Sequence, residues 1–145
     1  MTTRRDLREW AVQLLFQIDL NSPDDRDAAF AGFWADKDII QKSVRFTEEL
    51  VVGVLDHLEE IDHKLAAIAH HWDIGRMGVL DRNVIRLAMY EICYREDIPP
   101  AVSINEAVDI AKYFSSDESG RFVNGILDRV RRDMERPVGE RCREQ

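Results

Sequence analysis

The sequence predicts an all-α protein with about seven helices in a single domain. Apolar residues recur at steps of three and four along most of the chain, which is the spacing of one helix face. The 145 residues include only 7 glycines and 4 prolines, fewer than the turns of a β-rich fold normally require. Charged residues make up 33% of the chain, as is typical of solvated helix faces. An apolar content of 45% is enough for one domain with a core.

The first helix is expected over residues 4–20, with Thr3 as its N-cap. Its apolar stripe consists of Leu7, Trp10, Ala11, Leu14, Leu15 and Ile18. After a break, Ser22 can cap a second, short helix with Pro23 in its first turn, because proline fits the start of a helix. This short helix ends before the polar connection at residues 36–38.

The middle of the chain has a helical pattern from residue 39 to residue 72. This length favours two helices rather than one, with a break near residues 56–61. The next helix is expected over residues 80–95. It ends ahead of Pro99, because the residue before a proline avoids the helical conformation.

The last third of the chain contains two patterns of a helix capping box, in which a serine is followed three residues later by a glutamate. They predict helices over residues 103–114 and 115–134. We therefore expect a helical domain over residues 1–136, followed by a polar and loose tail over residues 137–145.

The formal net charge of −8 is unevenly distributed. Residues 1–20 are balanced, residues 21–75 carry −7, residues 76–118 carry −3 and residues 119–145 carry +2. If the two ends of the chain meet in space, they can form one face that tolerates phosphates, in spite of the acidic total. The apolar stretches are too short for a membrane helix or a signal peptide, so we expect a cytoplasmic protein without membrane contact.

The sequence contains no pattern that predicts catalysis. Helical metal sites place two ligands three or four residues apart, and no two of the four histidines have that spacing. The histidines are His57, His63, His70 and His71. One Glu-x-x-His pattern, Glu60 with His63, occurs once, whereas a di-iron bundle needs two copies. We expect no catalytic residue, no metal and no cofactor.

Four segments of the chain resemble the NusB family in order and spacing. They are residues 4–13 (RRDLREWAVQ), 81–91 (DRNVIRLAMYE), 98–108 (IPPAVSINEAV) and 111–128 (AKYFSSDESGRFVNGILD). The resemblance spans roughly residues 4–132, which makes it far more specific than any one short motif.

The resemblance implies two packed helical bundles in one all-α domain. It also implies a transcription antitermination factor that binds the boxA element of nascent RNA, a single-stranded segment. The family binds this RNA together with NusE, a ribosomal protein of the small subunit, and joins the RNA polymerase antitermination complex on ribosomal RNA operons. Some family members form homodimers, so the monomer and the homodimer both stay open for this chain.

The resemblance assigns RNA binding to two groups of residues. The first is Arg4, Arg5 and Arg8, although Asp6 replaces an arginine that is common in the family. The second is Lys112, Glu118, Arg121 and Phe122. In this group the resemblance implies that the Phe122 ring stacks on a base and that Glu118 borders the RNA site. We expect the two groups to lie side by side. The alternative is that the arginines are an ordinary solvated flank and that Phe122 is a core residue.

The resemblance places Asp81 and Arg82 on the side that faces NusE, although both also fit simple charge complementarity at a helix start. The family signature residues Asn105, Asn124 and Gly125 are expected to have structural roles. Two other functions stay open. One is a protein-binding helical module without RNA binding, and the other is an accessory domain like those of certain ribosomal RNA cytosine methyltransferases.

Overall fold

The computed structural model describes residues 2–69 and 77–134, and in these ranges the chain is all-α. The helices are α1 (Arg4–Asn21), α2 (Arg26–Trp34), α3 (Gln41–Asp56), α4 (Leu58–Ile68), α5 (Val79–Tyr94), α6 (Pro100–Phe114) and α7 (Asp117–Met134). Their number and order confirm the fold class expected from the sequence. The predicted tail at residues 137–145, the domain boundary at 136, and His70 and His71 lie outside the described residues.

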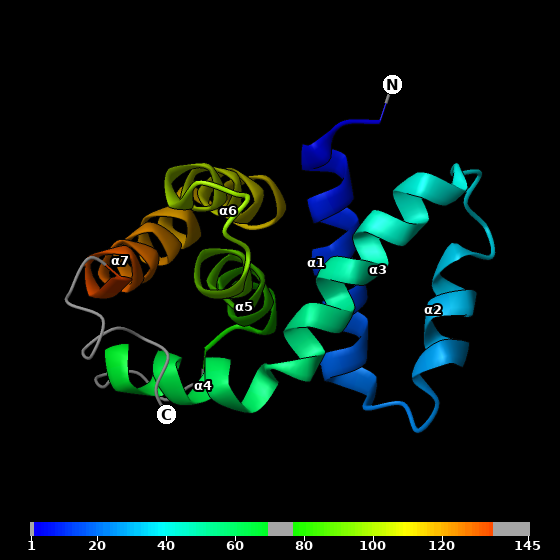
Figure 1. The fold of residues 1–145 in the computed structure, drawn as a ribbon, viewed down its shortest axis with the longest axis horizontal. Helices are drawn as coiled ribbons and strands as arrows, with labels where there is room; N and C mark the ends of the chain where they lie inside the picture. The colour runs from blue at the N-terminus through cyan, green and yellow to red at the C-terminus, as the bar shows by residue number, and fades with distance from the viewer. Residues whose placement is uncertain (1, 70–76, 135–145) are drawn as a thin grey trace.

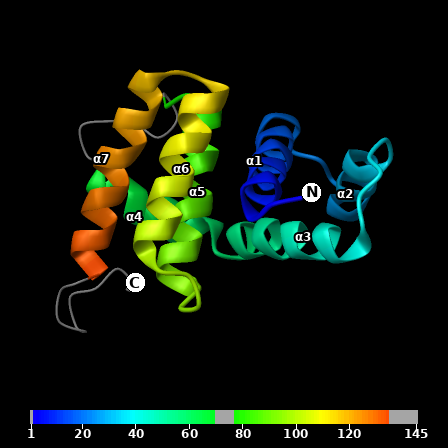
Figure 2. The ribbon, with the colours of Figure 1, turned by 90° about the horizontal axis from the view of Figure 1, so that it is seen from above.

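The helices form two bundles that share one core. In Figures 1 and 2, α1, α2 and α3 lie on one side of the molecule, and α4 to α7 lie on the other. Helix α1 packs against both α3 and α5, and α5 packs in turn against α6 and α7, so α1 and α5 join the bundles. The centre is apolar and fully buried, with Leu14, Leu15, Leu50, Ile85, Met89 and Leu127 among its largest side chains.

The predicted break in the long helical region falls at His57, between α3 and α4. The backbone N–H of His57 still bonds to the carbonyl of Gly53, and its ring nitrogen Nδ1 lies 2.9 Å from the same oxygen. Position 53 requires a glycine, because a Cβ there would collide with Cζ of the Tyr90 ring on α5. The turn at the end of α3 is therefore held tightly against α5.

The start of α2 differs from the prediction. Ser22 does not cap this helix, because it ends α1 in the left-handed conformation (φ 44°) and donates its N–H to the carbonyl of Ile18. Asp25 takes the N-cap position instead, and its carboxylate accepts the N–H of Ala28 at 3.2 Å. Pro23 lies before the helix rather than in its first turn.

The starts of α6 and α7 also differ from the predicted capping boxes. Helix α6 begins at Pro100, three residues before Ser103, because proline is pre-organised for the first helical position. Ser103 is thus inside the helix, where its hydroxyl is free for a tertiary hydrogen bond. In α7 the capping serine is Ser116 rather than Ser115, and its Oγ accepts the N–H of Ser119 at 3.1 Å.

None of the helices in the described ranges combines the length and the apolar character needed to cross a lipid bilayer.

Candidate nucleic-acid interface

The start of α1 is exposed and tightly capped. The Thr3 hydroxyl accepts the N–H of Asp6 at 3.1 Å, and the Asp6 carboxylate accepts the N–H of Thr3 at 2.9 Å. This reciprocal capping box gives Asp6 a clear role at the position where the family commonly has an arginine. The cap fixes the first turn, so that Arg4 and Arg5 project from a rigid helix end.

Arg4 is exposed, and its guanidinium lies over the ring of Phe46 from α3, 4.1 Å from the ring centroid. Across residues 2–69 and 77–134, Arg4 forms no ion pair. A cation held over an aromatic face keeps its charge and its hydrogen-bond donors. Arg4 is therefore the arginine of this helix that is best placed to meet an anion.

Arg5 is partly neutralised by two carboxylates of α6. It forms a bidentate hydrogen bond with Glu106, and its Nη2 also lies 3.0 Å from Oδ2 of Asp109. The bond to Glu106 raises the pKa of Arg5, and the same bond lowers the pKa of Glu106. The Arg5 side chain keeps 36% of its surface exposed, so a phosphate can reach it in competition with the two acids.

Arg8 is buried, which does not fit the predicted direct contact with RNA. Its side chain is 8% exposed, and its Nε and Nη2 donate to the Glu91 carboxylate of α5 at 2.8 and 3.1 Å. Glu91 is 1% exposed and also accepts the hydroxyl of Ser103 at 2.7 Å. This buried network connects α1, α5 and α6, so Arg8 holds the helix that carries Arg4 and Arg5 against α5 and α6.

An open cleft of about 530 Å³ lies beside the start of α1, between α3 and the turn that joins α5 to α6. Arginines and acids both line it: Arg4, Arg5, Arg8 and Arg95 with Asp97 and Glu106. Its apolar lining consists of Phe46, Ile98, Pro99 and Val102. Cationic groups above an apolar floor can bind a phosphate and a base at the same time.

A row of side chains continues from this cleft along α6. Val102, Glu106, Asp109 and Tyr113 follow one another at steps of three and four residues, so they share one side of the helix. Val102 and Glu106 line the cleft, and Asp109 contacts Arg5. Tyr113 lies one turn further on. The row spans about 16 Å from end to end, given the rise of a helix.

Tyr113 is an exposed aromatic residue that the sequence pattern did not assign to the site. Its surface is 74% exposed, and its ring makes an edge contact with Phe114 at a centroid distance of 5.1 Å. On a helical wheel, Tyr113 lies outside the arc of Ile104, Ala107 and Ala111, and this position was the available signal.

The second predicted group gathers where α6 meets α7. Lys112, Glu118 and Arg121 are exposed, and Phe122 is half-buried against the core. The stem of Lys112 crosses Gly120, where an added Cβ would lie 2.6 Å from the Lys112 Cγ. Phe122 therefore packs against the core and keeps some exposed surface, and stacking of its ring on a base stays a prediction.

The sequence predicted that the two groups lie side by side, but the structure separates them by the width of α6. Helix α6 lies between α1 and α7 in both views (Figures 1 and 2). The row from Val102 to Tyr113 links the groups, because it begins at the cleft and ends beside Lys112.

The predicted partner residues Asp81 and Arg82 are engaged inside the molecule. Oδ2 of Asp81 accepts the hydroxyl of Ser119 at 3.3 Å, and burial raises the pKa of Asp81. The Arg82 guanidinium pairs with Asp19 at 2.9 Å and is 13% exposed. The family signature residues were expected to have structural roles in the fold, but they lie on its surface. Asn105, Asn124 and Gly125 are exposed on helix surfaces.

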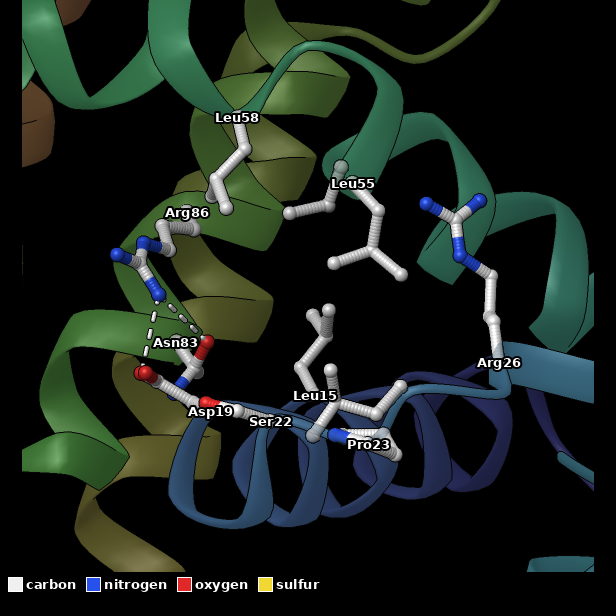
Figure 3. A pocket seen from close by; sticks show the side chains of 11 residues that line it. Leu15, Asp19, Ser22, Pro23, Arg26, Leu55, Leu58, Asn83 and Arg86 are labelled. Carbon is white, nitrogen blue, oxygen red and sulfur yellow. Dashed lines mark hydrogen bonds and ion pairs between the residues drawn. The ribbon is translucent and has the colours of Figure 1, made fainter. Parts of the chain in front are cut away.

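A separate cavity of about 320 Å³ lies where the end of α1 meets α2 and the α3–α4 junction (Figure 3). Leu15, Leu55 and Leu58 form apolar walls, and Arg86 borders it while donating to Asp19 at 3.0 Å. Arg86 also pairs with Asp62 at 2.8 Å, so its charge is balanced within the fold. Arg26 also lines the cavity and pairs with Asp56 at 3.6 Å, so both arginines of this cavity have carboxylate partners.

Within the part of the chain that the structure describes, no group of three or more histidine, cysteine, aspartate or glutamate side chains is arranged to hold a metal ion. The candidate site is therefore a binding surface made of cations, exposed rings and one cleft.

Comparison with known proteins assigns the family. The NusB family model matches residues 5–132. The chain belongs to the NusB family. A transcription antitermination protein NusB from Desulfitobacterium hafniense is 46% identical over 129 residues, which covers 88% of this chain and 87% of the relative.

Solved NusB structures share the fold of this NusB-family chain. T. maritima NusB has a TM-score of 0.80 and 36% identity, and the match covers 88% of this chain and 89% of that chain. A crystal structure of the antitermination factors NusB and NusE in complex with dsRNA has a TM-score of 0.76 and 28% identity, and it covers 87% of this chain and 93% of that chain.

Proposed function

We propose that this protein is a transcription antitermination factor that binds single-stranded boxA-type RNA together with NusE. It joins the RNA polymerase antitermination complex on ribosomal RNA operons, and it acts there in the cytoplasm as an adaptor without catalytic activity. The observation that carries the proposal is the exposed start of α1 in a NusB-family chain. Arg4 is unpaired over Phe46, and Arg5 lies against α6.

The RNA runs along α6 in this proposal. It contacts Arg4 and Arg5 at one end of the row and reaches Lys112, Arg121 and Phe122 at the α6–α7 corner. Glu118 borders the strand at that corner and limits its affinity. A single strand suits the exposed rings better than a duplex, because only unstacked bases can stack on aromatic side chains.

NusE is the proposed protein partner, since a solved relative with 28% identity was crystallised with NusE and dsRNA. Asp81 and Arg82 remain the proposed contact region, through the surface that their internal contacts leave exposed. Binding RNA and NusE at once raises the apparent affinity of each weak contact.

The test is a titration of labelled RNA that carries a boxA element, with and without NusE, against the wild type and Arg4→Ala. We expect tighter binding with NusE and a loss of about fivefold or more for Arg4→Ala. Arg129→Ala is the matched control, because Arg129 is also an exposed arginine but lies on the later half of α7. A duplex RNA of the same sequence should bind more weakly.

Two results would contradict the proposal. If neither RNA form binds with or without NusE, the protein is an RNA-independent helical module. If Arg4→Ala and Arg129→Ala weaken binding equally, the start of α1 is not the RNA site.

A further inference from the structure

The cleft between α1, α3 and the α5–α6 turn has the shape and the chemistry of a pocket for a flat, charged ligand. We propose that one unpaired base of the RNA enters this cleft and stacks on the guanidinium of Arg4, which Phe46 supports from below. The inference rests on the proposed function, because it names where one base of that RNA is bound.

The stack of Arg4 on Phe46 is the first step. The guanidinium lies 4.1 Å from the ring centroid, so one of its faces is covered by the ring. Bases stack on arginine planes as they do on aromatic rings. A guanidinium that already rests on a ring loses less conformational freedom when the base arrives.

The α5–α6 side of the cleft carries apolar side chains next to Arg95 and Asp97. Ile98 and Pro99 form the turn before α6, and Val102 follows in the first turn of that helix, where it is 42% exposed. Proline restricts the backbone of this side. The volume of about 530 Å³ falls within the range of small-molecule pockets. A base bound here would contact the guanidinium on one face and apolar atoms on its other side.

The charges of the cleft favour a planar ligand over a simple anion. Arg95 donates two hydrogen bonds of 3.1 Å to Asp97, and Arg5 is held by Glu106. Arg4 is the cation of this cleft that forms no ion pair within the described ranges. The hydrogen bond from Arg95 lowers the pKa of the nearby Asp97, and the charge of Arg4 helps to lower it further. The single available charge, on the planar guanidinium of Arg4 over Phe46, suits a nucleotide, whose base can stack on the plane and whose phosphate can meet the charge. An acidic peptide would need several free cations.

The cleft also opens onto the α6 row that the RNA is proposed to follow. Val102 and Glu106 belong to both, so a strand that passes Arg5 can place its next base in the cleft without leaving the surface. This continuity favours RNA as the occupant over a segment of a protein partner.

The first experiment compares substitutions that keep charge or volume but change the stack. Phe46→Leu keeps an apolar support and removes the ring, and Arg4→Lys keeps the charge and removes the plane. We expect each to weaken binding of the boxA RNA at least about fivefold, within the range for loss of one stacked base. Phe46→Tyr keeps the ring and should bind within about twofold of the wild type. Thermal unfolding of each variant checks that the fold is kept.

The second experiment locates the base. A series of the same RNA, each with one abasic site, is titrated against the wild type and Phe46→Leu. We expect one position to lose affinity in the wild type and to lose clearly less in Phe46→Leu, because the stack is already absent. Independent effects at every position would overturn the inference.

The outcomes separate this inference from the proposed function. If the wild type fails to bind RNA, the proposed function fails. If the wild type binds RNA but Arg4→Lys and Phe46→Leu bind equally well, only the base pocket is wrong. If Phe46→Leu weakens NusE binding and leaves RNA binding unchanged, the cleft belongs to the protein partner, and the base pocket is again wrong.

Discussion

At the residue scale, Arg8 shows how burial changes the meaning of a motif. Arg4, Arg5 and Arg8 form one arginine motif in the sequence, yet the first is exposed, the second is half-exposed and the third is buried. The partner of Arg8 is Glu91, 83 residues away, so no local pattern could have predicted the pair. The family resemblance singled out this helix end, but it could not predict which of its arginines are accessible.

Arg8→Ala should behave as a folding variant. Removing Arg8 leaves the carboxylate of Glu91 buried without its cation, which typically destabilises a protein by about 3–5 kcal/mol. Urea unfolding of Arg8→Ala measures this loss, with Arg129→Ala as an exposed control. Adding Glu91→Gln to Arg8→Ala should recover part of the stability, because the buried charge is gone. An Arg8→Ala protein as stable as the wild type would contradict the role of this pair.

The Arg5–Glu106 pair should make stability depend on pH. The hydrogen bond from Arg5 holds the pKa of Glu106 below its ordinary value of 4.5, so the folded state binds fewer protons than the unfolded state near that pH. The stabilisation is present above pH 4.5 and is lost as the pH falls through the lowered pKa.

We therefore expect Glu106→Gln to be less stable than the wild type by about 0.5–1 kcal/mol at neutral pH, a value kept low because Arg5 is partly solvated. The difference should shrink in acid. Urea unfolding at several pH values measures it, and Glu49→Gln, at an exposed position of α3, is the control. A difference that stays constant down to acid pH would show that Glu106 acts by packing alone.

At the scale of the elements, the periodicity predicted every described helix, but the capping rules predicted several starts incorrectly. The Ser103 pattern matched a capping box, yet Pro99 and Pro100 begin α6 earlier and free Ser103 and Glu106 for contacts with Glu91 and Arg5. A capping pattern in a sequence predicts only local hydrogen bonds. It cannot predict when a tertiary partner takes the same side chain.

Gly125 provides a test at this scale, because nothing inside the protein requires a glycine there. It is exposed in the middle of α7, and a Cβ added to it would meet no atom within 4 Å. Gly125→Ala should therefore stabilise the fold by about 0.5–1 kcal/mol, since glycine is a poor helix residue. Thermal unfolding checks the value. Gly53→Ala is the opposite case, because its Cβ would collide with Tyr90, and it should destabilise.

At the scale of the whole molecule, the charge of −8 does not prevent a local RNA surface. The proposed surface runs from the start of α1 along α6 to the α6–α7 corner, and α6 lies beside α1 in space although the two helices are far apart in the sequence (Figure 2). The balanced and basic ends of the chain thus both contribute to one region. The charge distribution along the sequence suggested that the two ends could meet. It could not predict that α6 lies between them, with Glu106 and Asp109 against Arg5.

Those acids set the expected salt dependence of RNA binding. Arg8 is buried, and Arg5 is held by Glu106 and Asp109, so Arg4, Lys112 and Arg121 are the cations best placed to meet phosphates. About three phosphate contacts on a single strand give a slope of roughly −2 in a plot of log affinity against log salt. Affinity should then fall about 20-fold between 50 and 200 mM salt.

This modest slope distinguishes a surface of few cations and stacked bases from one dominated by phosphate contacts. Titrations of the boxA RNA at four salt concentrations measure it. Asp109→Asn should increase the RNA affinity and make the salt dependence steeper. The substitution releases Arg5 from one of its two carboxylates and so adds part of a phosphate contact. Asp133→Asn, at the far end of α7, is the matched control and should change neither. Binding insensitive to salt in the wild type would mean that phosphates do not touch these cations at all.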